Sequence, residues 1–342
     1  MVTFANPYSP TERPQPERDH WGRPYVVPPT GGKPVPYTRT TTFVSAVEDM
    51  YKLGQWQQRH VARGVAFHDD LLAAIRDTDV EDRSTLNRLV DEAKERSGAG
   101  DAARHGTYLH SVTEAYDLGE DPSEVPRPLQ SYGELDSMSY LPDLAAYIAE
   151  TEPLKAVNVE LFTVNDPLKV AGTTDRVVEY EGKRYIADLK TGSIEHGIVK
   201  ISAQLAMYAR SRPYDFQKHE RLEPHGCEVD RGIVIHLPAG KGVCQLYWVD
   251  LLKGWEAVMR ARDMRSLRQL RFTDLSRPLV PFPQGPPNTL AQLIDAAMSR
   301  DEMTALWVEH RSEWTAEHTD LAQRRFAALD HPSADAERTT LS

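Results

Sequence analysis

Asp175, Asp188 and Lys190 are the residues of this sequence whose types and spacing are best suited to chemistry. When two aspartates face each other across a hairpin, their carboxylates leave the same side of the sheet with Cβ atoms roughly 5 Å apart. Lys190, two residues after Asp188, returns to that side because strand side chains alternate. Two carboxylates and a lysine that converge at the end of a hairpin predict a site for a divalent metal ion.

Such a site is suited to the hydrolysis of a phosphodiester, whose own negative charge shields it from attack. A hard divalent cation held by carboxylate oxygens offsets this charge and lowers the pKa of a bound water. A lysine beside it can position the attacking water and stabilise the charge that builds on the phosphoryl oxygens. The three residues therefore predict a nuclease site in which Lys190 does not tolerate replacement by alanine.

The hairpin itself is predicted from residues 172–192, which read GTTDRVVEYEGKRYIADLKTG. Two runs rich in β-forming residues, 176–180 and 184–189, flank Glu181-Gly182, which matches a two-residue hairpin turn. A turn at these two residues sets the register of the whole hairpin. In that register the two aspartates lie opposite each other.

Two further patterns lie before and after the hairpin. Gln204 and Tyr208 have i,i+4 spacing, which places them on one face of the helix that is expected after the hairpin. Upstream, the segment RHGTYLH has Gly106 one turn before His110. Because helical side chains lean toward the N-terminus, a glycine there is expected to leave His110 open to a ligand.

Taken in order, the motifs G-T-x-x-H, G-T-x-D, D-x-K-T-G and Q-x-x-x-Y resemble the RecB-like branch of the PD-(D/E)XK nucleases. That branch includes the RecB and AddB nuclease domains and the CRISPR-associated RecB-like exonucleases. Similar free-standing versions occur in phage genomes of high-GC hosts, some with a segment like residues 37–43, YTRTTTF. The resemblance covers about residues 37–270. It implies an α/β fold, with a mixed β-sheet flanked by helices as in restriction endonucleases.

The resemblance also implies roles for individual residues. It assigns His110, Asp175 and Asp188 as metal ligands, with the Leu189 carbonyl as a fourth and Glu160 as a further acidic residue. Lys190 is the implied catalytic lysine. Gln204 and Tyr208 match a motif that orients this lysine or contacts the DNA backbone.

The implied cofactor is Mg²⁺ or Mn²⁺, since one histidine ligand leaves room for Mn²⁺. Members of the family that carry an iron–sulfur cluster have four cysteines around the nuclease core. This chain has only Cys227 and Cys244, both after Gln204. We therefore expect no iron–sulfur cluster, which requires four thiolates. A count of two cysteines is consistent with a protein of a reducing compartment.

The net charge of −11 is unusual for a protein that binds nucleic acid, because such proteins usually present a basic surface. Linear DNA, single- or double-stranded, is nevertheless the expected partner. Four arginines that precede or accompany the first motif are the candidate phosphate contacts, with ordinary exposed arginines as the alternative: Arg39, Arg59, Arg63 and Arg104.

Nothing in the sequence predicts a membrane protein. No apolar run approaches the ~20 residues that cross a bilayer. The first residues, MVTFANPYSPTERPQPERDH, lack the basic start and apolar stretch of a signal peptide. We expect a cytoplasmic protein, located in the host cytoplasm if a phage encodes it.

Periodicity and turn residues predict helices and strands that alternate along the core. The expected helices cover residues 38–64, 84–93, 101–116, 142–150, 199–210 and 251–270, and the expected strands cover 157–164, 169–171, the hairpin, 232–237 and 243–249.

Composition divides the chain into five parts. Nine of the 24 prolines fall in residues 1–37, which predict an extended arm that is ordered only if it packs on something. A helical C-terminal domain with two tryptophans could dock a recombination partner such as an annealing protein or a helicase. The predicted parts are the arm (1–37), a nuclease domain (38–275), a Pro-rich linker (276–288), the helical domain (289–330) and a disordered tail (331–342).

Three functions fit these observations. The first is a metal-dependent DNA exonuclease that acts in phage or bacterial recombination or end processing. A structure-selective endonuclease would use the same residues. A DNA-binding or assembly protein on a nuclease fold is the third, but intact Asp175, Asp188 and Lys190 argue against lost catalysis.

Overall fold

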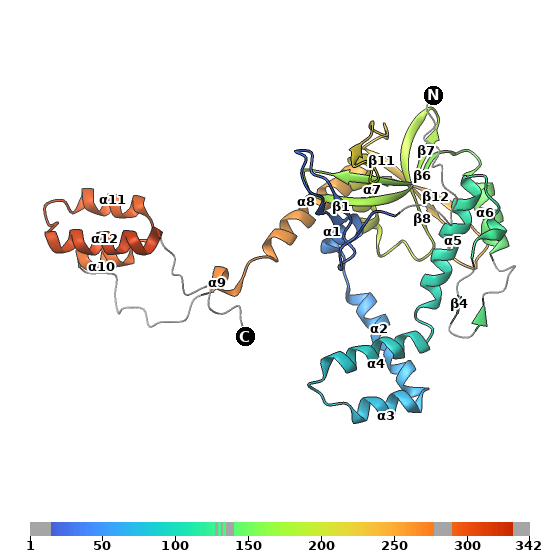
Figure 1. Cartoon of the computed structure of the whole chain (residues 1–342), viewed down its shortest axis with the longest axis horizontal. Coiled ribbons are helices and arrows are strands. Elements are labelled where there is room, and N and C mark those ends of the chain that lie inside the picture. The colour runs from blue at the N-terminus through green and yellow to red at the C-terminus, as the bar shows by residue number, and fades with distance from the viewer. Residues whose placement is uncertain (1–14, 127–128, 131–132, 135–139, 277–288, 331–342) are drawn as a thin grey trace. The chain divides into compact units, whose positions relative to one another are not determined.

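The computed structural model of the chain describes residues 15–126, 129–130, 133–134, 140–276 and 289–330 (Figure 1). The start of the predicted arm, almost all of the predicted linker and the predicted tail lie outside these residues. The chain divides into two compact units, Met1–Leu270 and Arg271–Ser342, and each is described by itself.

The first unit is built on a mixed sheet of eight strands. Seven of them follow the order β10-β9-β6-β7-β8-β11-β12, and the short strand β3 pairs with β7. The pairs β8–β11 and β3–β7 are parallel and the others are antiparallel. The strands are β3 (Thr38–Arg39), β6 (Lys155–Asn165), β7 (Val170–Tyr180), β8 (Lys183–Lys190), β9 (Arg212–Asp215), β10 (Glu220–Arg221), β11 (Arg231–His236) and β12 (Gln245–Asp250).

Helices cover both faces of this sheet (Figure 1). On one face α5 and α6 enclose a core that includes Leu109, Tyr147 and Leu189. On the other face α7 packs Leu205 against Val177, Ile186 and Val234. The helices of this unit are α1 (Thr40–Val44), α2 (Tyr51–Ala66), α3 (Asp69–Asp77), α4 (Arg83–Arg96), α5 (Asp101–Asp117), α6 (Leu141–Thr151), α7 (Ile198–Ala209) and α8 (Leu251–Leu267). The predicted α/β class, a mixed sheet flanked by helices, is confirmed.

The β7–β8 hairpin has the predicted register. Its pairs run from Tyr180 opposite Lys183 to Arg176 opposite Ala187. Both turn residues have left-handed backbone angles, with φ of 49° at Glu181 and 75° at Gly182. This is the geometry of a type I′ turn, whose twist matches that of the two strands.

The single helix predicted over residues 38–64 is wrong. The chain first forms β3, whose Thr38 and Arg39 pair with Val170 and Ala171 of β7. The short helix α1 follows, and Glu48, just before α2, forms an ion pair of 2.7 Å with Lys200. Contacts with distant strands and helices thus override the local helical pattern.

The described part of the predicted arm packs on the core. Residues 25–36 contain a small antiparallel pair, β1 (Tyr25–Val26) and β2 (Val35–Pro36). Val26 and Tyr37 are buried against Phe162 and Tyr214. The Tyr37 hydroxyl donates a hydrogen bond of 2.9 Å to Asp166, so this segment is anchored by both apolar and polar contacts.

The second unit contains a small helical core. Five buried residues form this core: Leu290, Ile294, Ala297, Met303 and Ala322. Met298 and Trp307, two large apolar residues of this unit, are 53% and 42% exposed. The helices are α9 (Phe272–Leu275), α10 (Leu290–Ala296), α11 (Arg300–Glu309) and α12 (Ala316–Asp330). In the parts of the chain that the structure describes, no helix of either unit is long and apolar enough to span a bilayer.

Candidate active site

The last hydrogen-bonded pair of the hairpin is Arg176 opposite Ala187. Asp175 and Asp188 lie one position beyond this pair, on the side away from the turn. Their neighbours Val177 and Ile186 pack against α7. Because side chains alternate along β8, the Asp188 carboxylate belongs to this face of the sheet. The Asp175 carboxylate lies beside His110 of α5. Asp188 is fully buried, and the Asp175 side chain is 16% exposed.

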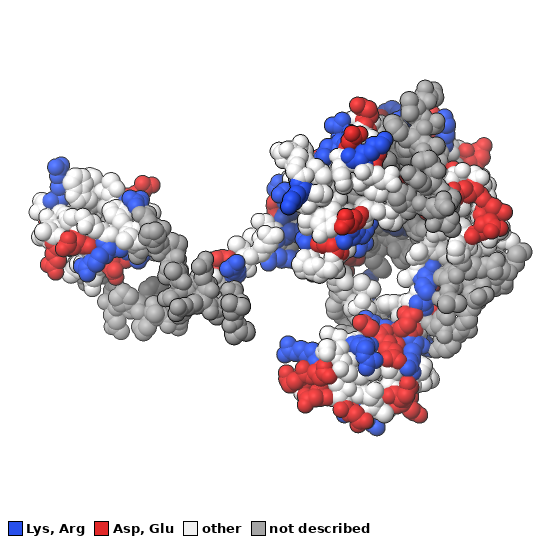
Figure 2. All heavy atoms as spheres, in the orientation of Figure 1, with Lys and Arg blue, Asp and Glu red and all other residues white. Residues whose placement is uncertain are grey.

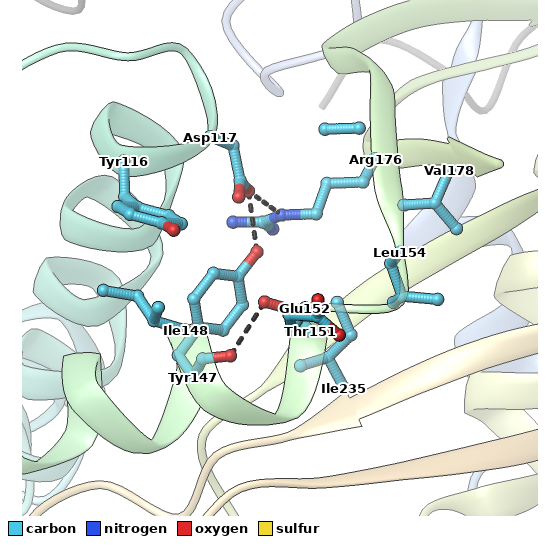
Figure 3. Close-up of a pocket in the computed structure, with 11 residues that line it drawn as sticks. Tyr116, Asp117, Tyr147, Ile148, Thr151, Glu152, Leu154, Arg176, Val178 and Ile235 are labelled. Atoms are coloured by element: carbon cyan, nitrogen blue, oxygen red, sulfur yellow. Dashed lines mark hydrogen bonds and ion pairs between the residues drawn. The ribbon is translucent and has the colours of Figure 1, made fainter. Parts of the chain in front are cut away.

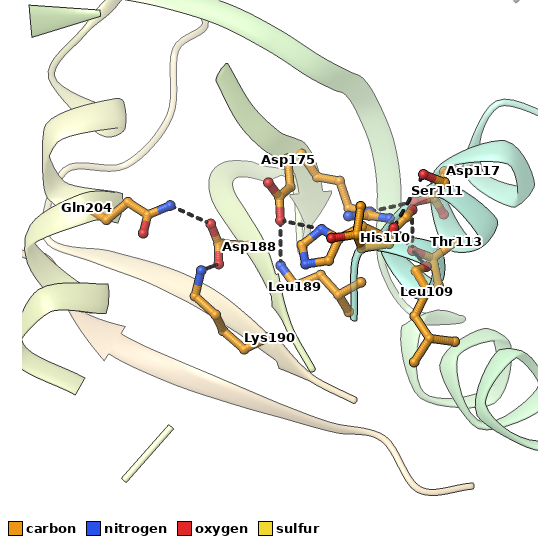
Figure 4. Close-up of polar contacts among 12 residues, drawn as sticks. Leu109, His110, Ser111, Thr113, Asp117, Asp175, Asp188, Leu189, Lys190 and Gln204 are labelled. Atoms are coloured by element: carbon orange, nitrogen blue, oxygen red, sulfur yellow. Dashed lines mark hydrogen bonds and ion pairs between the residues drawn. The ribbon is translucent and has the colours of Figure 1, made fainter. Parts of the chain in front are cut away.

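Each carboxylate has its own set of partners (Figure 4). Asp188 accepts a hydrogen bond of 3.0 Å from Gln204 Nε2 and forms an ion pair with Lys190. Asp175 Oδ2 accepts a hydrogen bond of 2.9 Å from the Leu189 backbone N–H. The same oxygen lies 3.4 Å from His110 Nδ1. Predicted residues of all four motifs therefore meet at the end of this hairpin.

Burial and mutual repulsion govern the charges of the site. Burial, and then the charge of Asp175, raise the pKa of Asp188 to about 6, although Lys190 opposes the shift. Burial lowers the pKa of Lys190, but Asp188 and Asp175 outweigh this effect and the net pKa is raised. The lysine is therefore a cation at neutral pH. Burial lowers the pKa of His110 and leaves its imidazole neutral, which is the form that binds metals.

Two close carboxylates and a neutral imidazole are a donor set that suits a divalent cation. The raised pKa of Asp188 points the same way, because a cation would relieve the repulsion from Asp175. Among the described residues, however, no three His, Cys, Asp or Glu side chains are gathered closely enough to form a ready-made metal site. In the structure as it stands, Lys190 and Gln204 hold the Asp188 carboxylate.

Comparison with known proteins agrees with this geometry. Residues 48–211 match the family model of the PD-(D/E)XK nuclease superfamily. This segment of the chain belongs to the superfamily. The matched range contains His110, Asp175, Asp188, Lys190 and Gln204. No curated protein matches the chain.

Glu160 of this nuclease lies opposite Asp175 on the neighbouring strand. The β6–β7 register pairs Val159 with Arg176 and Leu161 with Thr174, so Glu160 falls between them. Its φ of 53° is in the left-handed region, where residues other than glycine are uncommon. A strained backbone opposite the Asp175 carboxylate is consistent with a functional position, and Glu160 stays a predicted ligand.

Tyr208 lies behind the site and is 3% exposed. Burial, and then the charges of Asp188 and Asp175, raise its pKa. A Cβ at Gly172 of the G-T-x-D motif would lie 3.2 Å from Tyr208 Cε1 and 2.7 Å from Thr40 Oγ1. Only glycine gives Tyr208 this room. The burial of Tyr208 favours a role in positioning over direct contact with DNA.

Gly106 has a different role from the predicted one. A side chain at this position would collide with Thr191 Oγ1, the threonine of D-x-K-T-G. The glycine therefore lets α5 approach the segment after β8, instead of opening space around His110. Spacing along the helix could not show this contact, because Thr191 is 85 residues away along the chain.

Arg176 is a residue that sequence reasoning missed (Figure 3). Its buried guanidinium forms an ion pair with Asp117, which also accepts a hydrogen bond of 2.7 Å from Tyr147. Arg176 Nη2 donates a hydrogen bond of 2.8 Å to Thr113, whose hydroxyl bonds to the His110 carbonyl. This network fixes the turn of α5 that carries His110 against β7. The sequence does contain a signal for this buried ion pair, because Arg176 directly follows Asp175 at the start of an apolar strand run.

The same network borders a cavity of about 230 Å³. Residues from α5, α6 and the sheet line it, including Tyr116, Glu152, Val178 and Ile235 (Figure 3). Arg176 and Asp188 are on opposite faces of the sheet, so this cavity is separate from the carboxylates.

The four predicted phosphate contacts have different environments. Arg39, Arg59 and Arg63 are exposed. Arg104 is half-buried and forms ion pairs with Asp101 and Glu95, which neutralise its charge.

The two cysteines lie apart: Cys227 packs against the core under α7, and Cys244 packs against the core under α5 and α6. Burial raises the pKa of both thiols to about 12.

Proposed function

We propose that this nuclease is a metal-dependent deoxyribonuclease of the RecB-like branch that removes nucleotides from the ends of linear DNA. One observation carries the proposal: Asp175, Asp188 and Lys190 converge at the end of the β7–β8 hairpin, with His110 beside Asp175. The order of the four motifs supports the RecB-like assignment.

The proposed cofactor is Mg²⁺ or Mn²⁺, held by Asp175, Asp188, His110, the Leu189 carbonyl and Glu160. When bound, it would neutralise phosphate charge and supply an activated water. The chain's own groups do the rest. The Leu189 N–H holds Asp175, and Gln204 holds Asp188, so both carboxylates are preorganised.

Lys190 is proposed to stabilise negative charge on the phosphoryl oxygens. Its ammonium is paired with Asp188 and its side chain is 26% exposed, so we place it at the mouth of the site, within reach of a substrate. Its raised pKa keeps it positive throughout the physiological range. A cation fixed beside the reacting phosphate costs no reorganisation when charge develops.

An exonuclease in phage or bacterial recombination or end processing is the role we favour, in the cytoplasm. A structure-selective endonuclease stays the second candidate, because the same residues would serve both reactions. The C-terminal helical unit, with its exposed Trp307, is the proposed docking site for a recombination partner.

Cleavage assays with the full chain test the proposal. Single- and double-stranded DNA labelled at either end is incubated with Mg²⁺, Mn²⁺ or EDTA, and circular DNA is incubated in parallel. Lys190→Ala and Asp188→Ala are compared with Lys218→Ala, which changes an exposed lysine in the turn between β9 and β10.

Metal-dependent release of nucleotides by the native chain and Lys218→Ala, but not by the two site variants, would support the proposal. Internal cuts in circular DNA would favour the endonuclease. Tight DNA binding without cleavage in any metal would reject a catalytic function.

A further inference from the structure

Helix α2 has no acidic residue, and α7, which also lacks one, is mostly buried. Its sequence, YKLGQWQQRHVARGVA, contains one lysine and two arginines in a chain whose net charge is −11. The outer helices around it mix both signs of charge (Figure 2). An acid-free helix in an acidic protein is a local site of attraction for a polyanion.

The cations of α2 lie on one face together with aromatic rings. Five residues, spaced by three or four, form this basic face: Lys52, Trp56, Arg59, Arg63 and Phe67. The opposite side of α2 packs Val61 and Val65 against α4, where Gly64 touches the backbone of Ala93. The basic face therefore points away from the helix packing.

Its charges are not neutralised within the described residues. Arg59 and Arg63 are exposed, and neither has a carboxylate partner in the described part of the chain. The arginines of the adjacent helices differ, because Arg88 pairs with Glu92 and Arg96 with Asp70. The Arg63 guanidinium instead lies 5.8 Å from the ring of Phe67, which is 76% exposed.

One end of the basic face touches the segment that follows the active-site lysine. Lys52 Nζ lies 3.1 Å from His196 Nε2, in the connection between β8 and α7. The nearby ion pair of Glu48 with Lys200 joins the segment just before α2 to α7. From there α2 runs outward to the α3–α4 pair (Figure 1). At 1.5 Å per residue, Lys52 to Phe67 spans about 22 Å.

We propose that the basic face of α2 binds single-stranded nucleic acid and leads it to the active site. The inference rests on the proposed nuclease function. Cations that alternate with a half-buried and an exposed ring, Trp56 and Phe67, fit a single strand, whose phosphates pair with the cations and whose unpaired bases stack on rings. A duplex keeps its bases stacked inside and would gain only the phosphate contacts.

The test measures binding without cleavage. Anisotropy of a labelled oligo-dT of about 20 nucleotides is followed in EDTA, with full-length protein that carries Lys190→Ala. The test variant is Arg59→Ala/Arg63→Ala. The matched control is Arg83→Ala/Arg88→Ala, which removes two exposed arginines from the neighbouring helix α4.

The test variant should bind the oligonucleotide about tenfold more weakly or worse, and the control should bind like the parent. Loss of two phosphate contacts should reduce the slope of log K against log salt by about 1.4. Phe67→Ala should weaken binding at least about fivefold with the slope unchanged. Arg59→Lys/Arg63→Lys should restore most of the affinity, because it keeps the charge.

Equal binding by the test variant and its control would overturn the inference. So would a test variant that loses affinity for a hairpin duplex as much as for oligo-dT. Circular dichroism checks that every variant is folded. Cleavage by the native chain is measured separately. If the native chain binds through α2 but never cleaves, the proposed nuclease function fails and the binding face stands. If it cleaves and the α2 variant binds normally, only the binding face fails.

Discussion

Gln204 Nε2 donates a hydrogen bond of 3.0 Å to Asp188 Oδ1, and both groups are buried. This bond connects helix α7 to the strand that carries Asp188 and Lys190. It also stabilises the ionised form of Asp188, which burial and Asp175 disfavour. The Q-x-x-x-Y motif thus acts on the carboxylate of the site, and Lys190 is oriented indirectly through the same carboxylate.

Gln204→Ala should reduce the cleavage rate about 10- to 100-fold and lower the free energy of unfolding by about 1–3 kcal/mol, because a buried carboxylate oxygen loses its donor. Substrate affinity should change little. Rates at saturating DNA and urea titrations measure the two effects. Gln323→Ala, an exposed position in α12, is the control. A weaker affinity with an unchanged rate would contradict this role.

Stability without metal should fall as the pH rises from about 4 to about 6. The folded-state pKa of Asp188, about 6, is above the ordinary value of 3.8, so between these values the folded state binds more protons than the unfolded state. A shift of this size corresponds to about 3 kcal/mol at most, and the loss is complete above pH 6.

Urea titrations in EDTA at several pH values measure this dependence. Asp188→Asn should remove the fall, because the amide does not titrate. A variant that keeps the full pH dependence would show that another group is responsible.

Mg²⁺ or Mn²⁺ should raise the free energy of unfolding at pH 7. An ion at 100 times its dissociation constant stabilises by about 2.7 kcal/mol. Asp175→Asn should lose most of this stabilisation, whereas Asp215→Asn, which changes an aspartate of β9 away from the site, should retain it. Thermal unfolding with increasing metal measures the effect. Equal stabilisation of both variants would place the metal elsewhere.

Arg176→Ala should destabilise the nuclease by about 3–5 kcal/mol, since Asp117 would stay buried without its partner. The two side chains are 3% and 9% exposed. Arg231→Ala breaks an exposed pair with Asp230 and should cost less than about 1 kcal/mol. Denaturant titrations compare the two. If Arg176→Ala and Arg231→Ala lower the free energy of unfolding by similar small amounts, Asp117 finds another partner.

Gly172→Ala should destabilise the fold by about 1–3 kcal/mol, because the added methyl group would press on Thr40 and Tyr208. Thr40→Ala in the same chain should recover part of the loss by removing the nearest atom. Gly192→Ala is the matched control from the other glycine motif, since nothing lies within 4 Å of its Cβ position. Thermal unfolding of the three variants measures the effect.

The register of the β7–β8 hairpin could be predicted from the sequence alone. The Glu181-Gly182 turn is a local property, and it places Asp175 and Asp188 at matching positions of the two strands, directly beyond the last hydrogen-bonded pair. The i,i+4 spacing of Gln204 and Tyr208 is equally local. These patterns extend over a few residues, where backbone geometry leaves few choices.

Only the tertiary structure could decide which distant groups meet these residues. It places Glu160 opposite Asp175, packs Gly106 against Thr191, and pairs Arg176 with Asp117. It also shows that ion pairs neutralise the charge of Arg104, whereas the arginines of α2 are exposed. Each of these contacts joins segments that are far apart along the chain, or depends on how the helices pack. Local periodicity carries no information about such partners, because it specifies which face of an element a side chain is on and not what packs against that face.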